Sequence, residues 1–389
     1  MEDTFYWNAY LTRLFIPLHI LLILFIIIGV AGNGLVIYIY GFKMKTIKDG
    51  QYFIPYLAVA DLLGSVICSL FGLSMTLMPV TYEFDVLCKC GWLLGSATTC
   101  MSVFLLVTIA IQRYLKVCRR KGYILTLKWK KVVMICSLFL SVVITGPSVV
   151  TYGSIPFHSI NRNVTGMICG KITGTVSIVY DAVLCVSVIL CCGLLIVPYC
   201  LIGRKTYRYM KKGNQSEVEL KKFSKNKTFE QQTEEQSIST LDSELKIEYS
   251  KNYSSNEHLS DKILTDQGKQ SLRNNIKIIK KPPKNLTKTN RRVISKITKI
   301  FMIIILIFLI CSLPKISITI LETVTADFWE TASDIERLVL MFVHQGYILN
   351  NIANPFIYAF FDETFKTEIK NMFYQSVCAN KRYIFKVYN

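Results

Sequence analysis

Several acidic, hydroxyl and amide side chains stand inside long apolar stretches of this sequence, where water would not surround them. Asp61 lies about halfway along one stretch, and an unpaired charge at that depth costs at least ~2.5–3.5 kcal/mol. Its carboxylate therefore needs a cation or hydrogen-bond donors. Other stretches supply oxygen and amide groups at Asn33, Ser102, Asn350 and Asn354. These five residues predict either a small hydrated ion pocket or an internal hydrogen-bond network.

A second group of polar and aromatic residues predicts a ligand cavity. Lys315 directly follows Pro314 in the sixth apolar stretch, and Glu322 lies two helical turns further along. A lysine at that depth is an expensive ion, so we expect it either to face a ligand or to pair internally, with Asp181 or with a group of the seventh stretch. Further side chains that are candidates for the same cavity are Trp92, Thr99, Tyr180, His344 and Gln345.

Arg113 ends the third apolar stretch and is followed by Tyr114. Arginine is always charged and carries five N–H donors, so it can reach the backbone carbonyls of an inserted partner helix. The alternative is an ordinary cation that extends to the membrane surface.

The elements that must position these residues are seven apolar stretches, each with the roughly 20 residues that a membrane span needs. A backbone in lipid must satisfy its own hydrogen bonds, so each stretch is predicted to be a helix and the fold an all-α seven-helix bundle. The alternative of buried helices in a large soluble protein does not fit runs such as Ile20–Val30. The predicted spans are Leu14–Tyr40, Tyr52–Met78, Cys88–Val117, Val132–Tyr152, Thr173–Ile202, Val293–Val324 and Ile335–Phe361.

Charge predicts the orientation of the bundle. Most of the 45 Lys and Arg residues fall in the segments between spans one and two, three and four, and five and six, or after Phe361. Basic flanks remain cytoplasmic, so the N-terminus is expected outside and the C-terminus inside. The net charge of +19 then attracts anionic lipid of the inner leaflet, and nucleic-acid binding is not expected.

These assignments divide the chain into five parts. Residues 1–13 are an extracellular N-terminus, 14–204 hold spans one to five, and 293–361 hold spans six and seven. Residues 205–292 are polar and basic without a sustained apolar period, which predicts a long and mostly disordered cytoplasmic loop. Residues 362–389 are expected to form a cytoplasmic amphipathic helix and tail.

The 13 cysteines do not form a disulfide framework, because most lie inside spans. Cys88 opens the third span on the outer side, and Cys169 lies in the outer segment between spans four and five. A disulfide between them would hold that segment over the helix ends. Cys90 is a competing partner. Asn163 begins the one Asn-X-Ser/Thr acceptor in a segment placed outside, so we expect it to be glycosylated.

Five motifs in the right spans and the right order resemble the rhodopsin-like family of G-protein-coupled receptors. The resemblance extends over all seven spans. The motifs are Gly32-Asn33, Leu57-Ala58-Val59-Ala60-Asp61, Ser102 with Ile109-Ala110-Ile111-Gln112-Arg113-Tyr114, Phe308-Leu309-Ile310-Cys311-Ser312-Leu313-Pro314, and Asn350-Asn351-Ile352-Ala353-Asn354-Pro355-Phe356-Ile357-Tyr358.

The resemblance implies a plasma-membrane receptor that is not an enzyme and that signals to a heterotrimeric G protein and to arrestin. It implies that Arg113 meets the G protein's C-terminal helix, that Tyr199 and Tyr358 turn inward to support it, and that Phe308 is a switch residue. Pro314 would provide a hinge for an outward swing of the sixth helix. The cluster around Asp61 and Ser102 corresponds to a sodium site that favours the resting state.

The sequence also departs from the family pattern. Gln112 stands where an acidic residue usually precedes the arginine, and Ser312 stands where a tryptophan usually precedes the sixth-helix proline. Gly95 occupies the position at which receptors for biogenic amines carry Asp, which disfavours a monoamine ligand. A short peptide is the expected ligand, and Gly95 belongs to its expected site. A same-fold receptor that traffics or scavenges its ligand is the main alternative, and a transporter is a second one.

Overall fold

The computed structural model describes residues 2–44, 51–118, 126–208, 286–325, 328–372 and 374–375, with the side chains of the sixth span described from residue 302. Internal contacts divide the chain into one unit of Met1–Gly203 with Ser295–Asn389 and a second unit of Arg204–Ile294. Of the second unit, the structure describes residues 204–208 and 286–294, all of them helical. The predicted loop 205–292 therefore lies largely outside the described residues.

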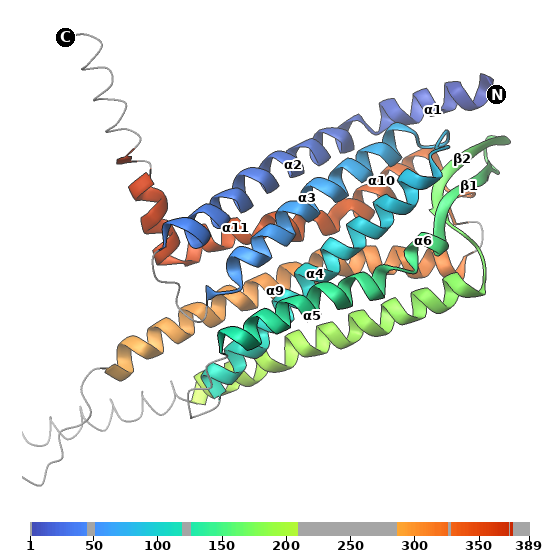
Figure 1. The fold of residues 1–389 in the computed structure, drawn as a ribbon. Helices are drawn as coiled ribbons and strands as arrows, with labels where there is room; N and C mark the ends of the chain where they lie inside the picture. The colour runs from blue at the N-terminus through green and yellow to red at the C-terminus, as the bar shows by residue number, and fades with distance from the viewer. Residues whose placement is uncertain are drawn as a thin grey trace, which may run out of the picture. The chain divides into compact units, whose positions relative to one another are not determined.

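Long helices make up the first unit (Figure 1). Helix α2 packs on α3 and α11, α3 packs on α4, and α4 packs on α5. The helices in chain order are α1 (Glu2–Leu14), α2 (Ile16–Ile37) with the π-helical η1 (Tyr38–Lys43), α3 (Ile54–Leu77), α4 (Asp85–Cys118), α5 (Leu127–Thr145), α6 (Ser148–Thr151), the unlabelled helix Thr175–Arg208, α9 (Leu286–Val324), α10 (Asp334–Gln345), the 3₁₀ turn η3 (Gly346–Ile348), α11 (Leu349–Phe361) and a helix at residues 363–372.

Among the described residues, six helices are long and apolar enough to cross a membrane. They correspond to the first six predicted spans. The seventh predicted span, Ile335–Phe361, is helical but is not continuous, because the turn η3 separates α10 from α11. The predicted seven-helix membrane fold is confirmed as a mostly helical bundle to which a two-stranded hairpin is added, and the helix that follows the seventh span is present at residues 363–372.

The outward faces of the spanning helices remain apolar. On α2, Ile20, Ile23, Leu24 and Ile27 are all exposed and recur at the three- and four-residue spacing of one helical face. A large exposed apolar face of this kind marks a lipid contact rather than a water contact. The inward faces instead hold the buried polar residues that the sequence singles out.

The short N-terminal segment is a docked helix. Trp7 and Leu11 of α1 are buried, and Trp7 packs at 6.1 Å on Phe157 of the hairpin described next. Trp7 Nε1 donates to Asp334 Oδ1 at 3.3 Å, and Asn8 Oδ1 accepts from Val80 N at 3.2 Å. Residues 2–14 therefore contact the hairpin, the start of α10 and the segment after α3.

The connection between spans four and five is an antiparallel hairpin of β1 (Tyr152–Ser159) and β2 (Val164–Lys171), in which Ser159 pairs with Val164. Asn163 lies in its turn with φ +52° and is exposed. Asparagine tolerates this left-handed conformation better than most residues. The tip of the hairpin thus presents the Asn163 side chain to solvent.

Candidate functional site

A disulfide ties the hairpin to the first turns of α4. Cys88 bonds to Cys169 of β2 with a Cα–Cα distance of 5.5 Å, which confirms the predicted pair. Cys90, the competing partner, is a free and exposed cysteine. Next to the disulfide, the Trp92 ring of α4 stacks on Tyr152 of β1 at 4.0 Å. The disulfide and this stack hold the hairpin beside the N-terminal end of α4.

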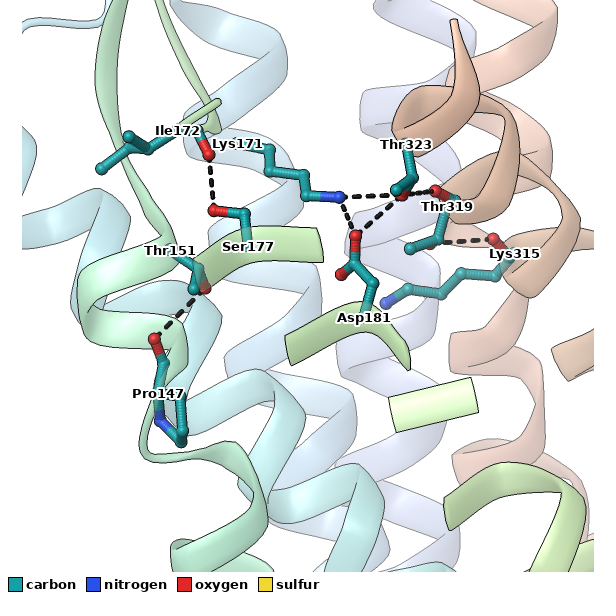
Figure 2. Close-up of polar contacts among 9 residues, drawn as sticks. All are labelled: Pro147, Thr151, Lys171, Ile172, Ser177, Asp181, Lys315, Thr319 and Thr323. Carbon is teal, nitrogen blue, oxygen red and sulfur yellow. Dashed lines mark hydrogen bonds and ion pairs between the residues drawn. The ribbon is translucent and has the colours of Figure 1, made fainter. Parts of the chain in front are cut away.

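A buried polar bridge connects the end of β2 to two spanning helices (Figure 2). Lys171 forms an ion pair with Asp181 of the helix Thr175–Arg208, and its Nζ donates to Thr323 Oγ1 of α9 at 2.8 Å. Thr323 Oγ1 in turn donates to Asp181 Oδ2 at 2.7 Å. Burial lowers the pKa of the Lys171 ammonium, and the nearby Glu322 carboxylate opposes that shift. In this bridge, each charged side chain is paired with a side chain from another element.

This bridge removes Asp181 as the internal partner considered for Lys315. Lys315 Nζ instead lies 3.4 Å from the centroid of the Tyr347 ring and 5.7 Å from that of the Trp92 ring. Tyr347 belongs to the seventh predicted span, so the contact is a cation–π pair with that span. Among the residues that the structure describes, no carboxylate lies within ion-pair distance of Lys315.

A small pocket of about 10 Å³, which is the room that one water molecule takes up, lies beside Lys315. Gly91 lets the Phe71 ring pack on α4 at this pocket, because a Cβ at this position would lie 2.1 Å from the ring. Five residues expected at the ligand site line the cavity, together with five others. The lining consists of Trp92, Gly95, Lys315, His344 and Gln345, with Phe71, Met75, Gly91, Ser96 and Tyr347.

Four residues expected at the ligand site are placed elsewhere. Asp181 belongs to the bridge with Lys171, and Glu322 accepts a hydrogen bond from Trp329 Nε1 at 2.6 Å. Thr99 donates to the Gly95 carbonyl of its own helix at 2.8 Å, and Tyr180 is buried. None of the four belongs to the lining of the cavity beside Lys315.

The polar cluster around Asp61 forms in the centre of the bundle. Ser102 Oγ donates to Asp61 Oδ1 and Asn354 Nδ2 donates to Asp61 Oδ2, each at 2.7 Å. Asn33 Nδ2 donates to the backbone oxygen of Asn351 at 2.9 Å, so Asn33 ties α2 to α11 without contacting Asp61 through that bond. Asn350 is buried on α11, and both hydrogen bonds to the Asp61 carboxylate come from other residues.

The oxygen atoms of this cluster fit a sodium ion. Each Asp61 oxygen accepts one hydrogen bond and keeps further acceptor capacity, as does Ser102 Oγ. Asn33 Oδ1 is buried without a hydrogen-bond partner among the described residues. Hard cations prefer oxygen ligands of this kind. Within the described part of the chain, no group of three or more His, Cys, Asp or Glu side chains could hold a metal ion, so the sodium candidate relies on one carboxylate with hydroxyl and amide oxygens.

Four of the expected switch residues gather around the second half of α4. Tyr199, Phe308 and Tyr358 are buried in one apolar cluster, and Tyr114 packs against it. Arg113 lies close enough for its charge to act on the phenols of Tyr199 and Tyr358. Gln112 is buried on α4, whereas Ser312 and Pro314 are half-buried within α9.

Comparison with known proteins identifies the family of this chain. Residues 32–358 match the family described as 7 transmembrane receptor (rhodopsin family). The chain belongs to the rhodopsin family of seven-transmembrane receptors. It is therefore a multi-pass membrane protein and a receptor rather than an enzyme.

Relatives with a described ligand match this receptor over a limited stretch. The gastrin/cholecystokinin type B receptors of Sus scrofa, Canis lupus familiaris and Rattus norvegicus are each 34% identical to it over 93 residues. That stretch is 24% of this chain and 21%, 20% and 21% of the three relatives. The match spans about a fifth of the length of these relatives, so their ligands remain a matter for proposal.

Sequence reasoning missed several residues of the receptor's cavity. Phe71, Met75 and Ser96 lie on spans whose apolar pattern gives no sign of which face meets the cavity. Gly91 and Tyr347 could have been found, because Gly91 lies one helical turn before Gly95, and Tyr347 lies three residues after His344. The Lys171 partner of Asp181 depends on the hairpin's register, which the sequence does not define.

Proposed function

We propose that this receptor binds a short extracellular peptide at the cavity beside Lys315 and activates a heterotrimeric G protein through Arg113. The separation of two sites on α4 carries the proposal. Trp92 lines the cavity, and Arg113 lies 21 positions further on, a distance of roughly 30 Å along a helix. A ligand at one end and a protein partner at the other can then bias one bundle between two states.

A peptide ligand is supported by the partial relatives, which are named for the peptides gastrin and cholecystokinin. The surroundings of the cavity also suit a peptide. The hairpin, α1 and the start of α10 lie together at this end, so residues of a peptide outside the cavity would have further surface to contact. Gly95, which carries no charge, gives an amine ligand no carboxylate at that position.

The orientation that we propose places this end outside the cell and the N-terminus with it, in the plasma membrane. The disulfide Cys88–Cys169 fits an oxidising compartment, and Asn163 at the exposed hairpin tip fits a glycosylation acceptor. The opposite end, with Arg113 and the basic segments, would meet the G protein, arrestin and the anionic inner leaflet.

Switching would use the two buried clusters. When sodium is bound, Asp61 and Ser102 would hold it, and its charge would stabilise the Asp61 carboxylate in the resting bundle. Tyr358 Oη is buried without a hydrogen-bond partner among the described residues. A rotation that gives this hydroxyl a partner near Arg113 would favour the active state, since a satisfied buried hydroxyl is worth about 1–3 kcal/mol more than an orphaned one.

The test is a screen of secreted peptides on cells that express the receptor, read by a G-protein biosensor. The matched control is Arg113→Ala at equal surface expression. We expect at least one peptide to activate the wild-type receptor and to lose its response in the control. A peptide that is bound and internalised with no biosensor response in the wild type would reject the proposal and support the alternative of a trafficking or scavenging receptor.

That alternative rests on Gln112 and Ser312, which replace an acid and a tryptophan of the family pattern. A transporter is a weaker candidate. Transporters with repeated halves carry paired broken helices. In the described residues, the 3₁₀ turn η3 breaks the seventh span near its middle, and the turn Gly146-Pro147 between α5 and α6 interrupts the fourth span only near its end.

A further inference from the structure

Among the described residues, no carboxylate lies within ion-pair distance of the Lys315 ammonium, and the Glu322 carboxylate acts on its charge from further away. Asp181 Oδ2 pairs with Lys171 and Glu322 accepts from Trp329 Nε1, while Asp181 Oδ1 is buried without a hydrogen-bond partner among the described residues. The rings of Tyr347 and Trp92 supply a cation–π environment instead. This environment stabilises the cation in place but leaves its N–H donors available.

Two more polar nitrogens in the same cavity lack hydrogen-bond partners. Trp92 Nε1 and His344 Nδ1 are both buried, and the structure gives neither a partner among the described residues. His344 is 6% exposed, so water does not satisfy it from the surface. The indole nitrogen is a donor in every state, and an imidazole nitrogen can donate. A buried donor without an acceptor is costly, so such a group is an exception that calls for a missing partner.

Both residues lie against one another and against the lysine. The ring centroids of Trp92 and His344 are 5.9 Å apart, and those of His344 and Tyr347 are 6.5 Å apart. All of them line the small pocket beside Lys315 together with Phe71 and Met75. The cavity thus combines a cation and neutral donors with an apolar and aromatic wall. Acceptor oxygens next to an apolar group are its chemical complement.

We propose that this cavity binds a carboxylate group of the ligand, with Lys315 as its counter-ion and Trp92 and His344 as further donors. The inference rests on the proposed ligand site and names the chemistry that the site selects. A carboxylate has two oxygens and about four acceptor positions, enough for an ammonium and both nitrogens. The carboxylate can belong to a peptide, as an acidic side chain or a C-terminus, or to a free carboxylic acid with an aromatic or aliphatic body.

The experiment measures the thermal stability of the purified full-length receptor in lipid nanodiscs with pairs of probes that differ in charge alone. Phenylacetate and phenylacetamide represent the free acid. The peptide acetyl-Ala-Ala-Phe, with a free or an amidated C-terminus, represents the peptide source. We expect the acid of at least one pair to raise the melting temperature with saturation and its amide to act about tenfold more weakly, which corresponds to about 1.4 kcal/mol.

Variants locate the effect. Lys315→Met should remove the difference between the effects of acid and amide on the melting temperature. Lys315→Arg should keep that difference, because arginine keeps the charge. Lys128→Met removes an exposed lysine of α5 and should leave the difference unchanged. If Lys315→Met fails to fold, the comparison of acid and amide on the wild-type receptor still decides.

The inference would be overturned if acid and amide had equal effects, or if Lys315→Met kept the preference for the acid. It would also be overturned if no acid had an effect at a concentration on the order of 10 mM, which is about the weakest binding that such a small probe would show. A response to phenylacetate alone supports the carboxylate site and rejects a peptide as its source, whereas a response to the peptide acid supports both. G-protein activation is read separately, so a signalling failure with intact acid preference would reject the proposed function alone.

Discussion

Removing Asp181 should destabilise the receptor far more than removing a surface charge. Asp181→Ala takes the carboxylate away from Lys171, whose side chain is 14% exposed, and leaves Thr323 as its described contact. Breaking a buried ion pair by removing one partner costs about 3–5 kcal/mol, because the remaining charge stays buried. At ~2–4 °C per kcal/mol the apparent melting temperature should fall by about 6–20 °C.

The double variant separates loss of the pair from loss of the side chains. Lys171→Met with Asp181→Leu replaces both charges with apolar groups of similar length, and such a replacement is often neutral or stabilising. We therefore expect the double variant to melt above Asp181→Ala. Thr323→Val removes the hydroxyl that contacts both charges and should cost about 1–3 kcal/mol.

The assay is thermal unfolding of the purified receptor in detergent, followed by a thiol-reactive dye. Lys89→Ala is the matched control, because Lys89 pairs with Asp85 on α4 while both side chains are much more exposed. Its melting temperature should stay close to that of the wild type. The reasoning would be refuted if the fall in melting temperature of the double variant equalled the sum of the falls for Lys171→Met alone and Asp181→Leu alone. That result would show that the two charges do not stabilise one another.

Three further outcomes are expected. Gln112 offers a neutral hydrogen bond to Arg113 where the family has an acid, so the receptor should signal without ligand. Gln112→Asp should lower that output by restoring about 1 kcal/mol of stabilisation to the resting state. Basal second-messenger levels equal to those of untransfected cells would contradict this prediction. Cys88→Ala and Cys169→Ala should each lower surface expression, and the double variant should be no worse than either; additive losses would argue against one shared bond. Asn163→Gln should remove all N-glycan from the receptor, as seen by its mobility on a gel. Glycan found on the 205–292 segment would contradict the orientation that we propose.

The sequence predicts the seven spans and the Asp61 cluster well because both follow from local rules. Apolar length identifies a span, and a carboxylate at that depth must attract donors, which turned out to be Ser102 and Asn354. The break at η3 was missed. Gly346 has the flexibility that a turn uses, but a single glycine in an apolar stretch does not separate a turn from a continuous helix.

Contacts that depend on the tertiary arrangement could not be predicted. Lys171 was a basic residue of an outer segment, and only the hairpin's register and its disulfide bring it to Asp181. Likewise, α1 was expected to be a short tail. Its docking depends on Trp7 meeting Phe157, a residue 150 positions away. Local patterns carry no information about such distant partners.

Nucleotide exchange on purified G proteins tests the central claim most directly. The wild-type receptor in nanodiscs should accelerate exchange on at least one class of Gα subunit above the rate without receptor, and Arg113→Ala, at the same folded concentration, should return the rate to that baseline. Exchange equal to the baseline with every class of Gα, or acceleration that survives Arg113→Ala, would contradict a receptor that couples to G proteins through Arg113.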